Sequence, residues 1–253
     1  MSHMLHIDVQ GDSGTPVVLL HGMPTQPEHT APLARELSGS HCTLVVHLPG
    51  YGNSPPLPAP YSVDRCRELI EEALAAQGVH EATLVGFSGG AWHAIGLALR
   101  GKLRVQKLVL LAGLAGFDPE HQAAFRGFAD ALRSGQDLRP VAPQQFLAAD
   151  FAAAHPDAVA GVTSWIDAIA PADLAAELDA AAEAPDQRPC LGELAMPVLC
   201  RAGELDAAVP TQASRAIAES VQKGTLQIVP GVAHALLYED FEATAAAVRE
   251  FVG

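Results

Sequence analysis

Seven short apolar runs recur along the chain, and longer helical patterns separate them. The first run, residues 5–9, alternates between apolar and polar positions, so we predict an antiparallel strand at the edge of a sheet. The other six are nearly continuous in Val, Leu and Ile, which is typical of strands buried on both faces of a parallel sheet. They cover residues 17–20, 42–46, 82–85, 107–111, 197–200 and 226–229. The pattern predicts an α/β fold: a mostly parallel, twisted sheet of about seven strands with helices on both faces.

Helical periodicity fills most of the intervals. Within 64–77 the apolar residues recur at the spacing of one helix face, with Ser62 as the expected N-cap and Gly78 as the expected stop. Further helices are predicted over 91–99, over 211–223 with Gly224 as the expected stop, and over 241–252.

Residues 113–190 interrupt this alternation, because they contain helical patterns and no convincing strand. Asp118 followed by Pro119 predicts a helix start, and apolar stripes over 125–132, 146–154, 159–169 and 174–178 predict four helices. We therefore predict a helical cap over 113–190, inserted into an α/β core of residues 1–112 and 191–253. Its aromatic residues form either a small core of the insertion or the apolar underside of a lid.

Composition narrows the choice of partner. The 253 residues are 49% apolar, which is ample for one core and excludes general disorder. The formal charge is −14, and the predicted cap carries twelve acidic residues against four arginines. Because nucleic acids and anionic membranes are also negative, we expect neither as a partner and predict a small-molecule substrate. The sequence does not distinguish a monomer from a homodimer.

The four cysteines show no close pairs, so the sequence predicts neither a disulfide framework nor a zinc site. We expect no metal and no cofactor. The N-terminus has neither a basic region nor an apolar signal stretch, and no apolar run approaches the roughly 18 residues of a membrane span. The expected location is the cytoplasm.

Candidate chemistry begins at Gly86-Phe87-Ser88-Gly89-Gly90, which matches G-x-S-x-G between a predicted strand and a predicted helix. This is the setting of a nucleophile elbow, a tight turn that needs glycine neighbours and presents the serine hydroxyl at the carboxyl edge of the sheet. Ser88 is therefore the candidate nucleophile.

A serine hydroxyl needs a base, and the base needs an acid to orient it. His234 follows the last strand and leaves the same sheet edge, so it is the candidate base. Asp206 follows the preceding strand and is the candidate acid, with Glu204 as the alternative. The chain order Ser88, Asp206, His234 is that of hydrolases with this elbow.

An oxyanion also needs two N–H donors. The amide of Gly89 is one candidate, and the amide of Met23 in the loop His21-Gly22-Met23-Pro24 is the other. We also expect Gly22, Phe87, Phe128 and Trp165 to contact the substrate.

These motifs, together with Gly203-Glu204-Leu205-Asp206 and the stretch from Gly231 to His234, resemble those of the α/β-hydrolase superfamily over essentially the whole chain. The resemblance implies that Ser88, Asp206 and His234 form a triad, that Met23 and Gly89 form the oxyanion hole, and that 113–190 is the cap. In the superfamily an Asp usually precedes Pro-Gly-x-Gly-x-Ser, and His47 stands there in this chain. We interpret His47 as packing within the loop, with a pocket contact as the alternative.

The serine nucleophile argues against relatives that attack with a carboxylate, such as haloalkane dehalogenases and epoxide hydrolases. We predict a serine hydrolase that cleaves a small, largely apolar carboxylic ester or lactone through an acyl-enzyme on Ser88. Alternatives on the same triad are a carbon–carbon bond hydrolase of ring-cleavage products and a cofactor-free haloperoxidase. An arginine-lined pocket would favour the carbon–carbon hydrolase, and Arg126, Arg133, Arg139 and Arg188 are the basic residues of the predicted cap. A relative that only binds a ligand is the alternative from another class.

Overall fold

The computed structural model describes residues 4–58 and 60–253, which contain a seven-stranded sheet. Its spatial order is β1-β3-β2-β4-β5-β6-β7. The strand β1 is antiparallel to β3, and the remaining neighbours are parallel. This confirms the predicted α/β fold and its antiparallel edge strand. The strands are β1 (Ile7–Gln10), β2 (Val17–Leu20), β3 (Thr43–Val46), β4 (Glu81–Phe87), β5 (Arg104–Leu111), β6 (Pro197–Gly203) and β7 (Lys223–Val229).

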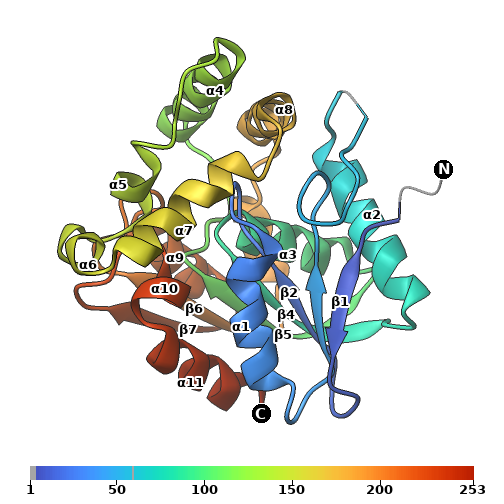
Figure 1. The fold of residues 1–253 in the computed structure, drawn as a ribbon. Coiled ribbons are helices and arrows are strands. Elements are labelled where there is room, and N and C mark those ends of the chain that lie inside the picture. The colour runs from blue at the N-terminus through green and yellow to red at the C-terminus, as the bar shows by residue number, and fades with distance from the viewer. Residues whose placement is uncertain (1–3, 59) are drawn as a thin grey trace.

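Helices cover both faces of the sheet (Figure 1). Val17 and Leu19 pack in one apolar cluster with α1 and α11, whereas Val18 and Leu20 pack in another with α2, α3 and α9. The parallel strands β2 to β6 are thus largely buried on both sides, as their continuous apolar sequences predict. The same prediction is wrong for β7, whose residues are exposed or only partly buried because it lies at the edge of the sheet. The helices of the core are α1 (Pro27–Leu37), α2 (Val63–Ala76), α3 (Gly89–Arg100), α9 (Thr211–Ser220), α10 (Leu236–Glu239) and α11 (Phe241–Val252).

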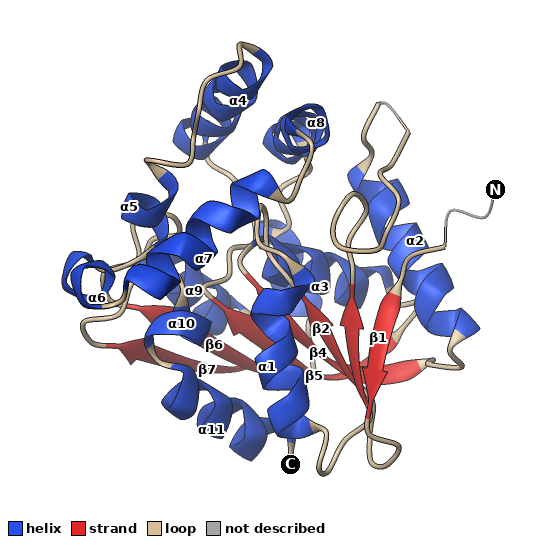
Figure 2. Cartoon of the chain, viewed as in Figure 1, coloured by secondary structure: helices blue, strands red, loops and turns tan. Residues whose placement is uncertain are grey.

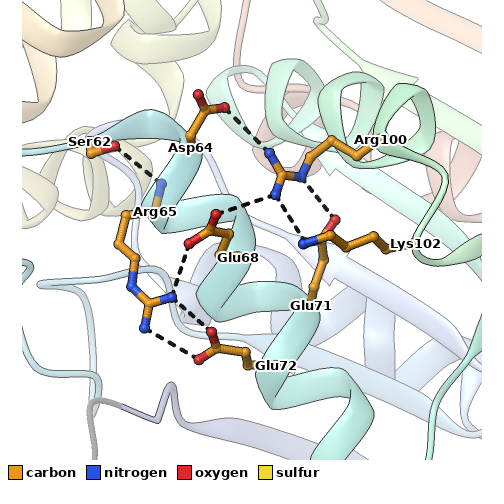
Figure 3. Close-up of polar contacts among 8 residues, drawn as sticks. All are labelled: Ser62, Asp64, Arg65, Glu68, Glu71, Glu72, Arg100 and Lys102. Atoms are coloured by element: carbon orange, nitrogen blue, oxygen red, sulfur yellow. Dashed lines mark hydrogen bonds and ion pairs between the residues drawn. The ribbon is translucent and has the colours of Figure 1, made fainter.

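The helix α2 begins as the sequence predicts. The Ser62 hydroxyl accepts a 3.2 Å hydrogen bond from the amide of Arg65, and Gly78 beyond the helix end has a φ of +74°. Polar side chains then line its outer face (Figure 3). Arg100, the last residue of α3, donates a 3.0 Å hydrogen bond to Glu71 of α2, which links the two helices at the surface.

One predicted helix boundary is wrong. We expected a helix over 211–223 with Gly224 as its stop, but α9 ends at Ser220 and β7 begins at Lys223. Lys223 pairs with Pro197 of β6, so the residues that resemble a last helical turn belong to a strand of the sheet instead. Gly224 has another role: a Cβ there would clash with the carbonyl oxygen of Ala218, so glycine lets α9 lie close to the strand.

Residues 113–190, here named the cap segment, connect β5 to β6 and lie above the end of the sheet where the parallel strands terminate (Figure 2). The second predicted helix of this segment is two helices, because the chain is extended at Leu147. Flanking backbone groups are bound to the core there: the Ala148 amide donates to Glu239, and the Phe146 carbonyl accepts from Ala235. The segment holds α4 (Pro119–Arg133), α5 (Ala142–Phe146), α6 (Ala149–Ala154), α7 (Pro156–Asp167) and α8 (Pro171–Glu183). The short 3-10 helix η1 (Arg188–Glu193) begins in its last residues and continues into the core.

None of the helices within 4–58 and 60–253 has the length and apolar character that crossing a membrane requires.

Candidate active site

Ser88 occupies a sharp turn between β4 and α3. Its φ of 52° and ψ of −118° are unusual for a residue with a side chain, and such strain persists only where the surroundings fix it. The Ser88 amide donates a 2.8 Å hydrogen bond to the carbonyl of Leu111 on β5. A Cβ at Gly90 would clash with the carbonyl oxygen of Leu20, and one at Gly86 would clash with the backbone of α3. The glycines of the motif are therefore what allows this turn to form.

His234 lies in the loop between β7 and α10, and its side chain is only 1% exposed. Its Nδ1 atom is 2.8 Å from Oδ2 of Asp206, which follows β6. The second carboxylate oxygen of Asp206 accepts a 2.8 Å hydrogen bond from the amide of Val209. The structure thus brings together the predicted base and acid, and both oxygens of the acid are bound. The alternative acid, Glu204, points elsewhere and accepts from the amide of Gly231.

The contact with Asp206 determines what His234 offers on its other side. A carboxylate cannot donate, so Nδ1 carries the proton of the neutral ring and Nε2 presents its lone pair. Nε2 has no hydrogen-bond partner among the described residues. The ring is flanked by Phe87 and Phe146, whose centroids lie 5.1 and 5.3 Å away. His234 is thus an oriented acceptor, available for a proton from a neighbouring group.

The loop after β2 brings a second backbone amide to Ser88. A Cβ built on Gly89 would lie 3.3 Å from the Met23 nitrogen, so Met23 and the first residue of α3 are neighbours. The first amides of a helix have no acceptor within it, so Gly89 offers a donor to this site.

The same loop is held in place by His21. The amide of Leu48 donates to its Nε2, so its Nδ1 carries the proton and donates to the carbonyl of Gly22 at 2.9 Å. Burial lowers the pKa of His21 to about 4, which keeps this ring neutral at neutral pH. His21 is therefore a positioning residue for the Met23 amide.

A cavity of about 500 Å³ lies between the core and the cap segment. Met23, Ser88, Gly89 and His234 border it on the core side, and residues of α4, α5 and α8 border it on the other. Most of its wall is apolar, and its acidic members are Glu120 and Glu177. Among the described residues, those that line it include neither a lysine nor an arginine. The four arginines of the cap segment lie outside this wall, and three of them pair with acidic residues of the same segment: Arg133 with Asp130 and Asp179, Arg139 with Asp137 and Asp167, and Arg188 with Asp186.

The residues expected to touch the substrate divide into two groups. Phe128 borders the cavity. Gly22, Phe87 and Trp165 lie behind its wall: a Cβ on Gly22 would come within 3.0 Å of the Ser88 Cβ, Phe87 packs against His234, and Trp165 stacks on Tyr238. His47 also lies away from the cavity, where its ring accepts from the amide of Asn53, as a loop-packing role requires.

Seven polar residues of the wall are absent from the sequence prediction: Tyr61, Trp92, His93, Glu120, His121, Gln145 and Glu177. The side chains of Trp92 and His93 each have a nitrogen with no partner among the described residues, and burial holds the pKa of His93 well below its ordinary value. The sequence does contain one indication for Glu177. It lies between Leu174 and Leu178 on the apolar stripe of α8, where a charged residue is unusual unless it has a specific role.

One cluster has the residue types of a metal site: His6, Asp8 and His47 have ligand atoms within 4.8 Å of one another. Its hydrogen bonds argue against that role. Nδ1 of His47 accepts from the amide of Asn53, so Nε2 carries the proton and donates to Asp8 at 3.0 Å. A protonated nitrogen has no lone pair for a metal, and the cluster is accounted for as a link between β1 and the loop after β3.

The family model of the Alpha/beta hydrolase family matches residues 17–247, so the chain belongs to the alpha/beta hydrolase family and is an enzyme of that family. It is 29% identical over 265 residues to the pimeloyl-acyl-carrier-protein methyl ester esterase of Vibrio vulnificus strain YJ016, with 100% of both chains covered. It is 28% identical over 257 residues to the biotin biosynthesis bifunctional protein BioHC of Cellvibrio japonicus. That match covers 93% of this chain but 47% of the other, so the chain spans about half of that relative's length. The solved structure of a thermophilic esterase from Thermogutta terrifontis shares the fold, with a TM-score of 0.91 and 24% identity over 98% of this chain and 92% of that one.

Proposed function

We propose that this enzyme hydrolyses a small carboxylic ester or lactone through an acyl-enzyme on Ser88. One observation carries the proposal: Ser88 and His234 border the same cavity, and Asp206 holds the His234 ring so that Nε2 has no hydrogen-bond partner among residues 4–58 and 60–253. The similarity to an esterase over the full length of both chains supports the same reaction class.

In the first half of the reaction, the Ser88 hydroxyl oxygen attacks the carbonyl carbon while its proton moves to Nε2 of His234. The Asp206 carboxylate stabilises the imidazolium that forms. The amides of Met23 and Gly89 stabilise the oxyanion. When the tetrahedral intermediate collapses, the bond to the alcohol oxygen breaks and that oxygen takes the proton from His234.

In the second half, water replaces the alcohol. The water gives a proton to His234 and attacks the acyl carbon, and collapse releases the carboxylic acid as the proton returns to the Ser88 oxygen. The flanking rings of Phe87 and Phe146 exclude bulk water from the imidazole, which strengthens its interaction with the carboxylate.

We further propose that the cap segment selects the substrate, because α4, α5 and α8 supply much of the cavity wall. The apolar wall favours an ester or lactone with an uncharged body. A carbon–carbon hydrolase of ring-cleavage products would need cations for a dienoate carboxylate, and the lining residues include neither lysine nor arginine. This argues for an ester or lactone substrate over that alternative.

The test is steady-state hydrolysis of p-nitrophenyl esters from acetate to octanoate, with two lactones and a ring-cleavage dienoate beside them. We expect turnover of esters or lactones by the native enzyme and a loss of at least 10³-fold in kcat in Ser88→Ala. Ser164→Ala, which removes an exposed hydroxyl of α7, is the matched control and should retain native activity. Dienoate cleavage without ester cleavage, or full activity of Ser88→Ala, would overturn the proposal.

A further inference from the structure

The cavity wall contains a carboxyl group, that of Glu177, in which one oxygen accepts a hydrogen bond and the other accepts none from the described residues. Glu177 of α8 is 5% exposed, and its Oε2 accepts a 2.5 Å hydrogen bond from the hydroxyl of Tyr51. Its other oxygen, Oε1, makes no hydrogen bond to the described residues. Glu177 borders the cavity, whereas Tyr51 lies behind it. The contact with Tyr51 thus accounts for one of the two oxygens and leaves an acceptor on the cavity side.

A hydroxyl group without a partner lies beside this carboxyl group. The Tyr61 hydroxyl is buried, borders the same cavity and has no hydrogen-bond partner among the described residues. It lies close enough to the Glu177 carboxyl group and to the Cys66 thiol to lower the pKa of each against the effect of burial, but its geometry makes a regular hydrogen bond to neither among the described residues. The neighbouring wall is apolar and includes Leu48, Val63, Leu174 and Leu178. The two polar groups therefore form an isolated pair in an apolar surface.

Packing alone does not explain this pair. Buried polar groups in proteins are nearly always hydrogen-bonded, because an unpaired one reduces stability. A phenylalanine at position 61 would keep the ring and avoid the unpaired hydroxyl. The pair is explained if a ligand completes its hydrogen bonds.

We propose that Glu177 and Tyr61 form a subsite that binds a hydroxyl group on the substrate, at a part remote from the ester bond. A hydroxyl both donates and accepts, so it can donate to Oε1 of Glu177 and accept from the Tyr61 hydroxyl. An alkyl group would leave both unpaired. A carboxylate would face Glu177 without a cation in the wall. The inference rests on the proposed function, and it defines the substrate as a hydroxy ester rather than a plain or dicarboxylic one.

The protonation state of the carboxyl group does not change this conclusion. Burial raises the pKa of Glu177 to about 7, so both forms are present near neutral pH. A carboxylate accepts at Oε1, and a carboxylic acid keeps acceptor lone pairs there while it gains a donor.

The test compares esters of equal length that differ only at the remote end. One series is methyl ω-hydroxyalkanoates of five to eight carbons, and the other is ω-hydroxyalkyl acetates, each against the alkyl, ω-amino and ω-carboxylate analogues. We expect kcat/KM for the hydroxy ester to exceed that of every analogue at least tenfold at one length, because sites built for a hydroxyl reject molecules that lack it.

The variant Tyr61→Phe removes the donor without breaking a hydrogen bond within the described residues. We expect it to lower kcat/KM for the hydroxy ester and raise it for the alkyl ester, so that their ratio falls at least tenfold. Tyr238→Phe removes a hydroxyl from outside the cavity and should leave the ratio unchanged. Equal or better turnover of alkyl, amino or carboxylate esters at every length, or a ratio unaffected by Tyr61→Phe, would overturn the subsite.

A binding measurement separates this outcome from failure of the proposed reaction. Calorimetric titration of Ser88→Ala with the hydroxy and alkyl esters needs no chemistry. We expect at least tenfold tighter binding of the hydroxy ester, lost in Ser88→Ala/Tyr61→Phe. If the native enzyme hydrolyses neither ester but this preference is present, the reaction is wrong and the subsite stands. If esters are hydrolysed and the preference is missing, the reaction stands and the subsite is wrong.

Discussion

The hydroxyl of Tyr51 donates a 2.5 Å hydrogen bond to Glu177, which joins the loop after β3 to helix α8 of the cap segment. The carboxyl group is buried, and burial raises its pKa from 4.5 to about 7. This single contact couples the docking of α8 to the protonation of one residue, and it has a measurable consequence for stability.

Glu177 binds a proton more tightly in the folded state than in the unfolded chain. Its contribution to the free energy of unfolding is therefore fully present below about pH 4.5 and is lost as the pH rises through 7. We expect Glu177→Gln to be more stable than the native protein at pH 8, by up to about 3 kcal/mol. Urea unfolding at pH 5 and pH 8 measures the difference. Glu183→Gln, an exposed residue of the same helix, is the control, and equal effects of both variants would contradict the assignment.

Three buried histidines change the free energy of unfolding with pH in the opposite direction to Glu177. Burial lowers the pKa of His21 to about 4 and that of His29 to about 3, and it holds the pKa of His93 well below 6.5. Such groups contribute stability above the unfolded pKa that is lost as the pH falls through 6.5. We expect the free energy of unfolding to decline steeply between pH 6.5 and pH 4, with up to three extra protons bound by the unfolded chain. A flat profile over this range would contradict the neutral state of these rings.

His29 allows this argument to be tested at one position. Neither ring nitrogen has a hydrogen-bond partner in the described part of the chain, and the ring packs against Phe87, Trp165 and Tyr238. We expect His29→Phe to raise the free energy of unfolding by about 1 kcal/mol at pH 7 and by roughly 2 kcal/mol more at pH 5. Unfolding of the exposed variant His80→Gln should follow the native profile. A loss of stability in His29→Phe at both pH values would show that the nitrogens are satisfied.

The tight turn at Ser88 requires glycine at position 90, and this requirement can be tested by substitution. Gly90→Ala places a Cβ against the carbonyl oxygen of Leu20, so we expect a loss of several kcal/mol together with loss of activity. Gly127→Ala should instead stabilise the protein by about 0.5–1 kcal/mol, because a Cβ at this position of α4 would meet no other part of the described chain within 4 Å. Thermal unfolding of both variants measures the contrast. Similar melting temperatures would mean that the turn tolerates a side chain.

The two acids after β6 provide a matched pair. Asp206 contacts the His234 ring and Glu204 does not. We expect Asp206→Asn to lower kcat by about 10³- to 10⁴-fold, because the amide no longer favours the required tautomer and imidazolium. Glu204→Gln should stay within about twofold of the native rate. An equal loss in both variants would remove the specific role of Asp206.

Sequence patterns were informative wherever local chemistry fixes structure. The glycines around Ser88 predict a tight turn, and His234 and Asp206 follow strands whose carboxyl ends meet at one edge of the sheet. These inferences need only strand order and loop position.

Contacts between segments that are distant in the sequence could not be predicted in this way. Tyr51 and Glu177 are 126 positions apart, and their contact depends on how α8 docks against the loop after β3. The end of α9 was misplaced for a related reason: Gly224 resembles a helix stop, but the pairing of β7 with β6 decides its conformation. Periodicity describes one segment at a time, whereas docking and pairing depend on two.

The most direct test of the central claim is covalent labelling of the nucleophile. The native enzyme is treated with diethyl p-nitrophenyl phosphate, and intact mass and peptide mapping identify the modified residue. We predict one diethylphosphoryl group per chain, located on Ser88, with loss of ester hydrolysis in proportion to labelling. Ser164→Ala should label as the native enzyme does, and Ser88→Ala should not label. Modification of another residue, or ester hydrolysis that persists after complete labelling of Ser88, would contradict the account.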